Sequence, residues 1–516
     1  MSVPTSSPAS ETAAPPRLRD AWFALAGLSA VFLFEMLDNS VLTVALPTIG
    51  RDLTASTAAL QWVSGAYSVA FGGLMLLFGA VADRFGRRRV MLVGLVLLAL
   101  VSVATVLVTS VEQLIVVRAL TGVAAAMTTP GSMALAFRLF DRQDLRVRAL
   151  TVISTAGLVG LAVGPTIGGF VLAVAPWQVL LVANAPVAVV AFVGIRAGIA
   201  VDRAGDLHRD PVDLLGAVTG AVAVAGVLVT PTLFVVGAGA GSWAAVVLTV
   251  LAAAGFVVRQ HTAPYPLLDL RLVARPLVAS GLAHKAAAGL ATAGLSYLVT
   301  LQLQSGWGWP PALAAVGTLP QVVVLLASGR LVGPFVARVG LDRAAWTSAV
   351  AVVAGLAVFA GLGRHGYPFV VVALVLVAAG MRVVGAVAGT SVLTGLPADR
   401  TSVGAALVDT ASELATAVGI AASGTVLAAL VTGSVAAVHR SAAEGAAFSS
   451  AVQVAAVAVT VLAAVLVTLG IVAGRRGRGT RTDTRPGDDT EPGAGTDPRT
   501  SPVHTTPTTD QESTRA

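Results

Sequence analysis

The chain has 516 residues, of which 56% are hydrophobic and only 11% are charged. Soluble domains carry roughly 25% charged residues, so this composition excludes an ordinary soluble enzyme, and it excludes disorder for the bulk of the chain. Cysteine is absent, which rules out disulfides, cysteine-ligated metals and a cysteine nucleophile. The net charge of +7 comes from arginine, because Lys285 is the single lysine.

Two polar ends flank a long apolar region. Residues 1–20 are rich in Ser, Thr, Pro and Ala, and residues 475–516 in Thr, Pro, Asp, Gly and Arg, and we predict both segments to be disordered tails. Between them, apolar runs long enough to cross a bilayer follow one another closely, and unpaired backbone groups in lipid favour helices. We expect about fourteen spans: 21–47, 57–81, 90–109, 114–137, 149–174, 178–197, 212–234, 240–258, 276–303, 312–335, 345–363, 368–395, 402–432 and 448–473. The sequence therefore predicts an all-α integral membrane protein.

Arginine placement predicts the orientation of these spans. The connections on one side of the predicted membrane carry many arginines: Arg84, Arg87, Arg88, Arg89, Arg138, Arg142, Arg146, Arg148, Arg196, Arg203, Arg209, Arg259, Arg271, Arg275, Arg338, Arg343 and Arg400. The opposite connections carry Arg51, Arg364 and Arg440. Because basic residues concentrate in cytoplasmic loops, we expect a multi-pass protein of the cytoplasmic membrane with both termini in the cytoplasm. The basic excess then orients the chain and does not indicate nucleic-acid binding.

Several ionisable side chains lie inside the predicted spans. They are Glu35, Asp38, Arg118, Lys285, Arg382, Asp409 and Glu413. Each costs about 2.5–3.5 kcal/mol on insertion, so an intramembrane charge is a functional hypothesis by default. The alternative is that these residues form structural ion pairs, or snorkel from helix ends. Seven in one chain favour the functional interpretation.

The spacing of these charges suggests how they act. Glu35 and Asp38 share one helix face, and Asp409 and Glu413 share another. Counting about 1.5 Å of rise per residue places Asp38 and Arg118 at similar depth, so that they can pair. Burial favours the protonated form of a carboxylate, whereas a nearby arginine favours the ionised form. A carboxylate in such surroundings can exchange the arginine for a proton or a cationic substrate, as a proton-coupled switch requires.

Two motifs are built on glycine. Residues 79–89 read GAVADRFGRRR, which also fits an ordinary positive loop. Residues 160–169 read GLAVGPTIGG, a small-residue stripe that permits close helix packing. The motif residues are Gly79, Asp83, Arg84, Gly86, Arg87 and Arg88 in the first, and Gly160, Gly164, Pro165, Gly168 and Gly169 in the second.

Together with LDNSVLTVALP at 37–47 and the Arg118–Gly122 segment, these motifs resemble the major facilitator superfamily, specifically its fourteen-span drug:proton antiporters. The resemblance implies two six-helix bundles, 21–197 and 276–473, with an inserted helix pair at 212–258. It also implies a central cavity lined by spans 1, 4, 9 and 12, and a cytoplasmic latch formed by Asp83 with Arg84 and Arg87.

The sequence departs from the family pattern in the second half. There the counterpart of the loop motif reads GPFVARVG, at 333–340, with Ala337 in place of the aspartate. Asp409 and Glu413 stand where relatives commonly carry uncharged amides. The second latch should therefore be weak, and extra carboxylates should lie near the transport path.

We therefore predict a proton-coupled exporter of antibiotics or other amphipathic toxic molecules that works by alternating access. Asp38 is expected to carry the proton with Arg118 as its partner, Glu35 to be an accessory acid, and Asp409 and Glu413 to be secondary proton or cation sites.

Lys285, Arg382 and Tyr297 are expected to line the substrate cavity. We expect no metal, no cofactor and no enzymatic activity, with the proton gradient as the energy source and a monomer as the working unit. An importer or symporter on the same scaffold remains open, as does a membrane receptor, scaffold or intramembrane enzyme.

Overall fold

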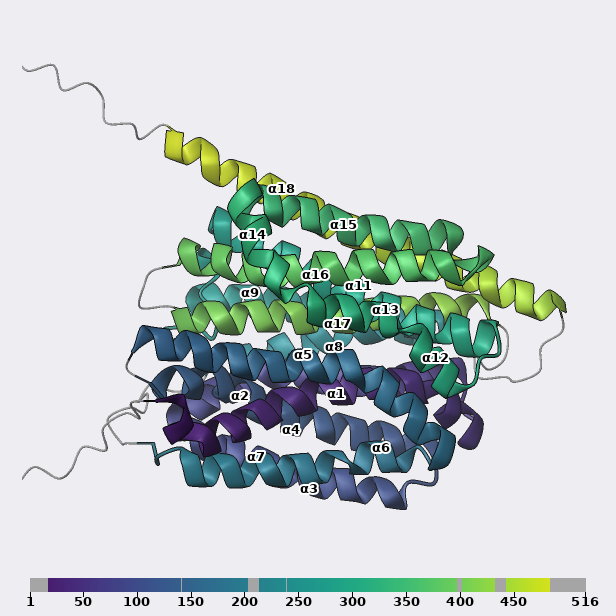
Figure 1. Ribbon diagram of the computed structural model, residues 1–516, viewed down its shortest axis with the longest axis horizontal. Coiled ribbons are helices and arrows are strands. Elements are labelled where there is room, and N and C mark those ends of the chain that lie inside the picture. The colour runs from purple at the N-terminus through teal and green to yellow at the C-terminus, as the bar shows by residue number, and fades with distance from the viewer. Residues whose placement is uncertain are drawn as a thin grey trace, which may run out of the picture. The chain divides into compact units, whose positions relative to one another are not determined.

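A computed structural model describes residues 17–140, 142–202, 213–237, 239–396, 401–431 and 442–482. Every regular element in these ranges is a helix (Figure 1). Within these ranges, twelve helices are long and apolar enough to cross a membrane, or up to fourteen when each of two bent pairs counts as one span. The prediction of an all-α membrane protein with about fourteen spans is confirmed.

The helices of the amino-terminal half precede a two-helix insertion. They are η1 (Leu18–Ala21), α1 (Trp22–Asp52), α2 (Thr57–Phe85), α3 (Arg87–Ala104), η2 (Thr105–Leu107), α4 (Val111–Arg138), α5 (Gln143–Val174), α6 (Gln178–Val182) and α7 (Asn184–Gly198). The insertion consists of α8 (Leu214–Val236) and α9 (Ala240–Thr262).

The carboxy-terminal half follows a short connecting helix, α10 (Leu270–Val273). Its helices are α11 (Pro276–Leu301), the π-helical turn η4 (Gln302–Gly306), α12 (Pro311–Gly317), α13 (Leu319–Ala327), α14 (Gly329–Val339), α15 (Leu341–Leu362), η5 (Gly363–His365), α16 (Tyr367–Gly395), α17 (Thr401–Leu430) and α18 (Ala442–Thr482).

The ends of the chain fall mostly outside the described residues. This holds for 1–16 and 483–516 of the two predicted tails, and for Arg203, Arg209, Arg400 and Arg440 of the loop arginines. Helical structure begins at Leu18 and continues to Thr482, past the predicted tail boundaries at 20 and 475. By internal contacts, residues 478–516 form a separate unit. The cavity and the buried charges all lie in the first unit.

The predicted span at 312–335 is broken. It consists of α12, α13 and α14, with a bend of 62° between the last two. Pro320 stands in the first turn of α13, where its missing N–H is tolerated, and it cannot continue the preceding helix. Gly329 begins α14 at the bend. The run is as apolar as a straight span, and hydropathy does not distinguish the two.

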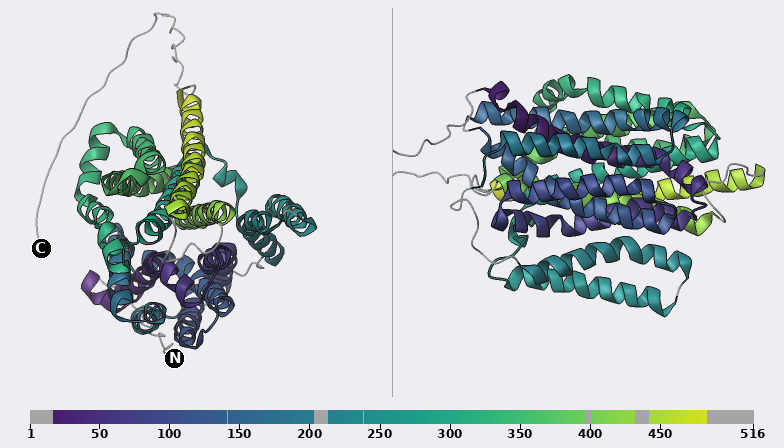
Figure 2. Two further views of the ribbon diagram at one scale, coloured as in Figure 1. Left: turned by 90° about the vertical axis from the view of Figure 1, so that its right-hand side faces the viewer. Right: turned by 90° about the horizontal axis from the view of Figure 1, so that it is seen from below.

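Each half of the chain packs mainly within itself. In the first half α1 packs against α5 and α7, and α2 against α4; in the second, α11 packs against α16 and α17. The halves meet along two seams, α2 with α17 and α5 with α12. Figure 2 shows the α8–α9 pair as a hairpin beside the other helices, and α8 contacts both α2 and α17.

A polar cluster holds the inserted hairpin at the α2–α17 seam. Gln61 on α2 is 4% exposed, and its Nε2 donates to Thr232 on α8 at 2.9 Å and to Thr425 on α17 at 3.0 Å. It also lies 3.1 Å from the carbonyl oxygen of Ala421. Three helices from three parts of the chain therefore share one amide.

Thr232→Val should lower the free energy of unfolding by about 1 kcal/mol, because buried hydrogen bonds between membrane helices contribute about 0.6 kcal/mol on average and up to about 1.7. Thr219→Val is the matched control on α8, since the Thr219 hydroxyl donates only to carbonyls of its own helix. Thermal unfolding in detergent measures both. Equal effects of the two variants would show that the cluster does not anchor the hairpin.

Candidate functional site

A dry ion pair lies in the interior of the amino-terminal half. Arg118 Nη1 on α4 is 2.7 Å from Asp38 Oδ2 on α1, and the two side chains are 1% and 0% exposed. Asn184, the first residue of α7, donates its Nδ2 to the second oxygen of Asp38 at 2.7 Å. The Tyr67 ring on α2 lies 4.7 Å from the guanidinium carbon of Arg118, a cation–π distance. Four helices thus enclose one pair of charges.

A central cavity of about 660 Å³ lies between the two halves. This volume is within the range of sites for drug-sized molecules. Its walls come from α1, α4 and α5 on one side and from α11, α13, α14, α16 and α17 on the other. The two halves therefore form this cavity jointly.

The two acids of α1 have different surroundings. Glu35 lies in the cavity wall and accepts a hydrogen bond from Thr129 Oγ1 on α4 at 2.9 Å. Asp38, one helical turn later, lies behind the wall in its pair with Arg118. The acid that faces the cavity is therefore Glu35, although the sequence motif is centred on Asp38.

The opposite wall carries four more charges. Lys285 on α11, Arg382 on α16, and Asp409 and Glu413 on α17 all line the cavity. Both α17 carboxylates therefore share the cavity with the Lys285 ammonium and with Glu35 of the opposite wall. Of the charged residues predicted to be functional, the structure thus brings five to one cavity.

Tyr297 does not lie in the cavity wall. It is 2% exposed and packs in the apolar core with Leu298 and Val299. Twelve residues separate it from Lys285, and at about 100° per residue this turns its side chain roughly 120° away around the helix. Thr292 and Ser296 lie on the Lys285 face and do line the cavity.

The loop motif at 79–89 builds a tight turn between α2 and α3. Asp83 Oδ1 is 2.7 Å from Arg87 Nε, which spans the turn as an ion pair. Gly86 has a φ of +103°, and a Cβ there would lie 2.7 Å from Asp202 Oδ2. That same oxygen accepts from the backbone N–H of Arg88 at 3.0 Å, at the start of α3. The turn needs glycine for its conformation and for space.

The remaining motif residues have local contacts. The Arg84 guanidinium lies 5.7 Å from the centre of the Phe85 ring. Arg88 Nη2 donates to the carbonyl of Arg196 at the end of α7, at 2.8 Å. Gly79 faces Pro130 of α4, where a Cβ would meet it at an ordinary contact distance of 3.8 Å. All of these contacts lie within the amino-terminal half.

The glycine stripe of α5 lies against α1. A Cβ at Gly160 would be 2.7 Å from the carbonyl oxygen of Leu33, and one at Gly164 would overlap the Ser40 side chain. The Ser40 hydroxyl donates to the Gly160 carbonyl at 3.3 Å. At Gly168 the space is wider, because a Cβ there would be 3.6 Å from the nearest atoms of Val41 on α1. The stripe therefore lets α5 approach α1 closely beside the charged residues.

The end of the same motif faces the other half of the chain. A Cβ at Gly169 would be 2.6 Å from the carbonyl oxygen of Pro311 on α12, and Pro165 lines the cavity. Nearby, Gln304 Nε2 of η4 donates to the Val44 carbonyl of α1 at 3.1 Å. These contacts hold the halves together toward the end at which α1 terminates.

Four functional contacts were not predicted from the sequence: those of Asn184, Tyr67, Thr129 and Asp202. The sequence does offer a signal for Asn184, because Trp177, Asn184 and Pro186 keep part of a further motif of the superfamily, W-R-W-x-F-x-x-N-x-P. The other three are common residue types in helices or loops, and only the packing of distant segments brings them to the site.

Gly160→Ala should lower the free energy of unfolding by about 1–3 kcal/mol, because the added methyl group forces α1 away from α5. Gly168→Ala, on the same stripe, should change it by less than about 1 kcal/mol. Thermal unfolding in detergent compares the two. A tolerated Gly160→Ala would contradict the tight α1–α5 contact.

Arg118→Met should destabilise the protein by about 3–5 kcal/mol, because it leaves the Asp38 carboxylate buried without its counter-ion. The double variant Asp38→Asn with Arg118→Met should recover most of this loss. A double-mutant cycle on unfolding free energies measures the coupling. Additive effects of the two substitutions would mean that the pair is not energetically coupled.

Comparisons with known proteins agree with this architecture. A family model described as Major Facilitator Superfamily matches residues 28–420. The crystal structure of the POT family transporter PepTSo superposes with a TM-score of 0.64 at 16% identity, over 91% of this chain and 99% of that one. The superfamily resemblance carried by the motifs is confirmed.

Two curated relatives extend the comparison. The cephamycin export protein CmcT of Amycolatopsis lactamdurans is 34% identical over 338 residues, covering 64% of this chain and 68% of that protein. The multidrug efflux pump LfrA of Mycolicibacterium smegmatis is 30% identical over 414 residues, covering 79% of this chain and 81% of that pump. These relatives are transporters and not enzymes.

Proposed function

Since this chain belongs to the Major Facilitator Superfamily, we propose that it exports amphipathic toxic small molecules, antibiotics among them, in exchange for protons. Two relatives that are 34% and 30% identical to it over the aligned residues are named as an export protein and an efflux pump. A cavity of about 660 Å³ between the two halves is large enough for such cargo.

One observation carries the proton-coupling part of this proposal. Three carboxylates, those of Glu35, Asp409 and Glu413, line the cavity next to the dry pair of Asp38 and Arg118. A buried carboxylate exchanges its negative charge for a proton when its surroundings change. Protons and cargo can therefore compete for the same small volume.

In the proposed cycle, the cavity-facing acids take up protons from one side of the membrane and release cargo there. Protonation of Asp38 removes the charge that holds Arg118, so the helices that enclose the pair can rearrange. Loss of the proton to the other side resets the pair. A membrane potential of 100 mV supplies about 2.3 kcal/mol for each charge that crosses.

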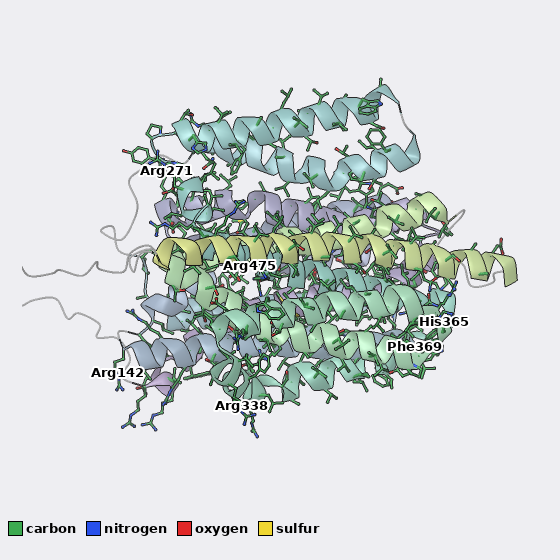
Figure 3. All side chains as sticks on the ribbon, turned by 90° about the horizontal axis from the view of Figure 1, so that it is seen from above. Arg142, Arg271, Arg338, His365, Phe369 and Arg475 are labelled. Atoms are coloured by element: carbon green, nitrogen blue, oxygen red, sulfur yellow. The ribbon has the colours of Figure 1, made fainter. Side chains whose placement is uncertain are left out.

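The arrangement of the helices supports an orientation. Figure 3 shows Arg142 and Arg271 toward one end of the molecule and His365 toward the opposite end. We assign the arginine-rich end, where α1 begins, to the cytoplasm, with both termini on that side. In this orientation the contacts of Gly169 and Gln304 hold the halves together on the outer side, which supports assigning the structure to an inward-open state of the proposed cycle.

Within this cycle the loop motif acts as a cytoplasmic latch. Asp83, Arg84 and Arg87 lie at the turn between α2 and α3, where they can engage the other half when the cytoplasmic side closes. Lys285 and Arg382 contact the cargo from the carboxy-terminal half. The transporter works as a monomer, with the proton gradient as its only energy source.

Asp38→Asn and Glu35→Gln should each reduce proton-driven transport of ethidium into inverted membrane vesicles by about tenfold or more, since each removes one exchangeable proton site. Asp213→Asn is the control, because Asp213 pairs with Arg259 in the inserted hairpin, away from the cavity. Unchanged transport in both variants would reject the coupling role. Movement of ethidium in the opposite direction would indicate an importer.

A further inference from the structure

Arg382 lines the cavity without an acidic partner among the described residues. Arg118 is paired with Asp38, and Lys285 shares its part of the wall with the two carboxylates of α17, Asp409 and Glu413. Arg382 takes part in none of the ion pairs found within the described ranges. Its Nε is buried and has no hydrogen-bond partner there.

The guanidinium of Arg382 lies at the break between α13 and α14. A Cβ on Gly329, the first residue of α14, would be 2.8 Å from Arg382 Nη2, so glycine leaves the space that the guanidinium fills. Gly329 and Arg382 both line the cavity. The hydroxyl of Ser328, directly before the break, is also buried without a hydrogen-bond partner. The Arg382 guanidinium therefore lies in the cavity wall at the helix break, with an unused donor of its own.

An unpaired cation in a membrane interior is costly, and pairing with an anion removes most of that cost. A guanidinium offers a planar fork of N–H donors that matches the two oxygens of a carboxylate. The three carboxylates of the cavity wall, those of Glu35, Asp409 and Glu413, form no ion pair with Arg382. A carboxylate that arrives with the cargo can therefore supply the missing partner.

We propose that Arg382 forms an anion-binding subsite that receives the carboxylate of an amphipathic cargo, an inference that rests on the proposed export function. The cavity wall then has two binding regions of opposite charge. Glu35, Asp409 and Glu413 accept a cationic group or a proton, and Arg382 accepts the acidic group. The cavity is thereby suited to amphipathic acids and zwitterions as well as to cations.

The test compares two ligands that differ by one charge. An amino-xanthylium dye with a free benzoate, and the methyl ester of the same dye, are titrated against the purified full-length protein in neutral detergent, with fluorescence anisotropy as the readout. The wild type should bind the free acid more tightly than the ester. Arg382→Gln should weaken binding of the acid by about tenfold and leave binding of the ester within about twofold, because only the acid pairs with the guanidinium.

Two further variants make the test specific. Arg382→Lys keeps the charge without the fork and should restore part of the preference for the acid. Arg343→Gln, which removes an exposed arginine at the start of α15, should leave both affinities unchanged. If Arg382→Gln does not fold, the ratio of the affinity for the acid to the affinity for the ester, compared between the wild type and Arg382→Lys, still tests the subsite.

Several results would overturn the subsite. They are equal affinity of the wild type for acid and ester, equal loss of both ligands in Arg382→Gln, or failure of the acid to bind at all. A preference for the acid that disappears when phosphatidylglycerol is added would identify a lipid phosphate, and not the cargo, as the occupant. Binding in detergent needs no proton gradient, so a failure here is distinct from a failure of the vesicle transport assay.

Discussion

The structure depends on the cost of placing a charge in a membrane interior. Arg118 and Asp38 can be buried together only because each neutralises the other; Asn184 also donates to Asp38, and the Tyr67 ring lies against the Arg118 guanidinium. Four helices must hold their relative positions for this pair to persist. The same constraint makes the pair responsive, because one proton on Asp38 would remove the attraction that unites them.

Close packing transmits such a change to the cavity. The glycines of α5 bring it close to α1 because α5 contributes no side chain at these positions, and the last of these glycines touches α12 in the other half. A shift of α1 that follows a change at Asp38 therefore cannot be absorbed by loose side chains. In the proposed cycle such a shift would move α5, which forms part of the cavity wall and of the seam between the halves.

The charges of the cavity divide between the halves in an unequal way. The amino-terminal wall contributes one acid, Glu35, whereas the carboxy-terminal wall contributes two acids and two bases. Lys285 shares this wall with the two acids of α17, whereas Arg382 lies at the break between α13 and α14. We interpret the first wall as the proton-responsive side and the second as the side that recognises cargo.

The sequence by itself determined the number of spans, their helical nature and the pairing of Asp38 with Arg118. Hydropathy identifies the spans because it is a local property, and the constant rise of a helix gives the depth of each residue in the membrane. Only the tertiary structure decided that Glu35 faces the cavity while Asp38 lies behind it, that Tyr297 turns into the core, and that the span at 312–335 is broken. Each of these depends on the rotation or bending of a helix. Uniformly apolar helices carry little periodic signal for that rotation, so the packing of distant helices fixes it.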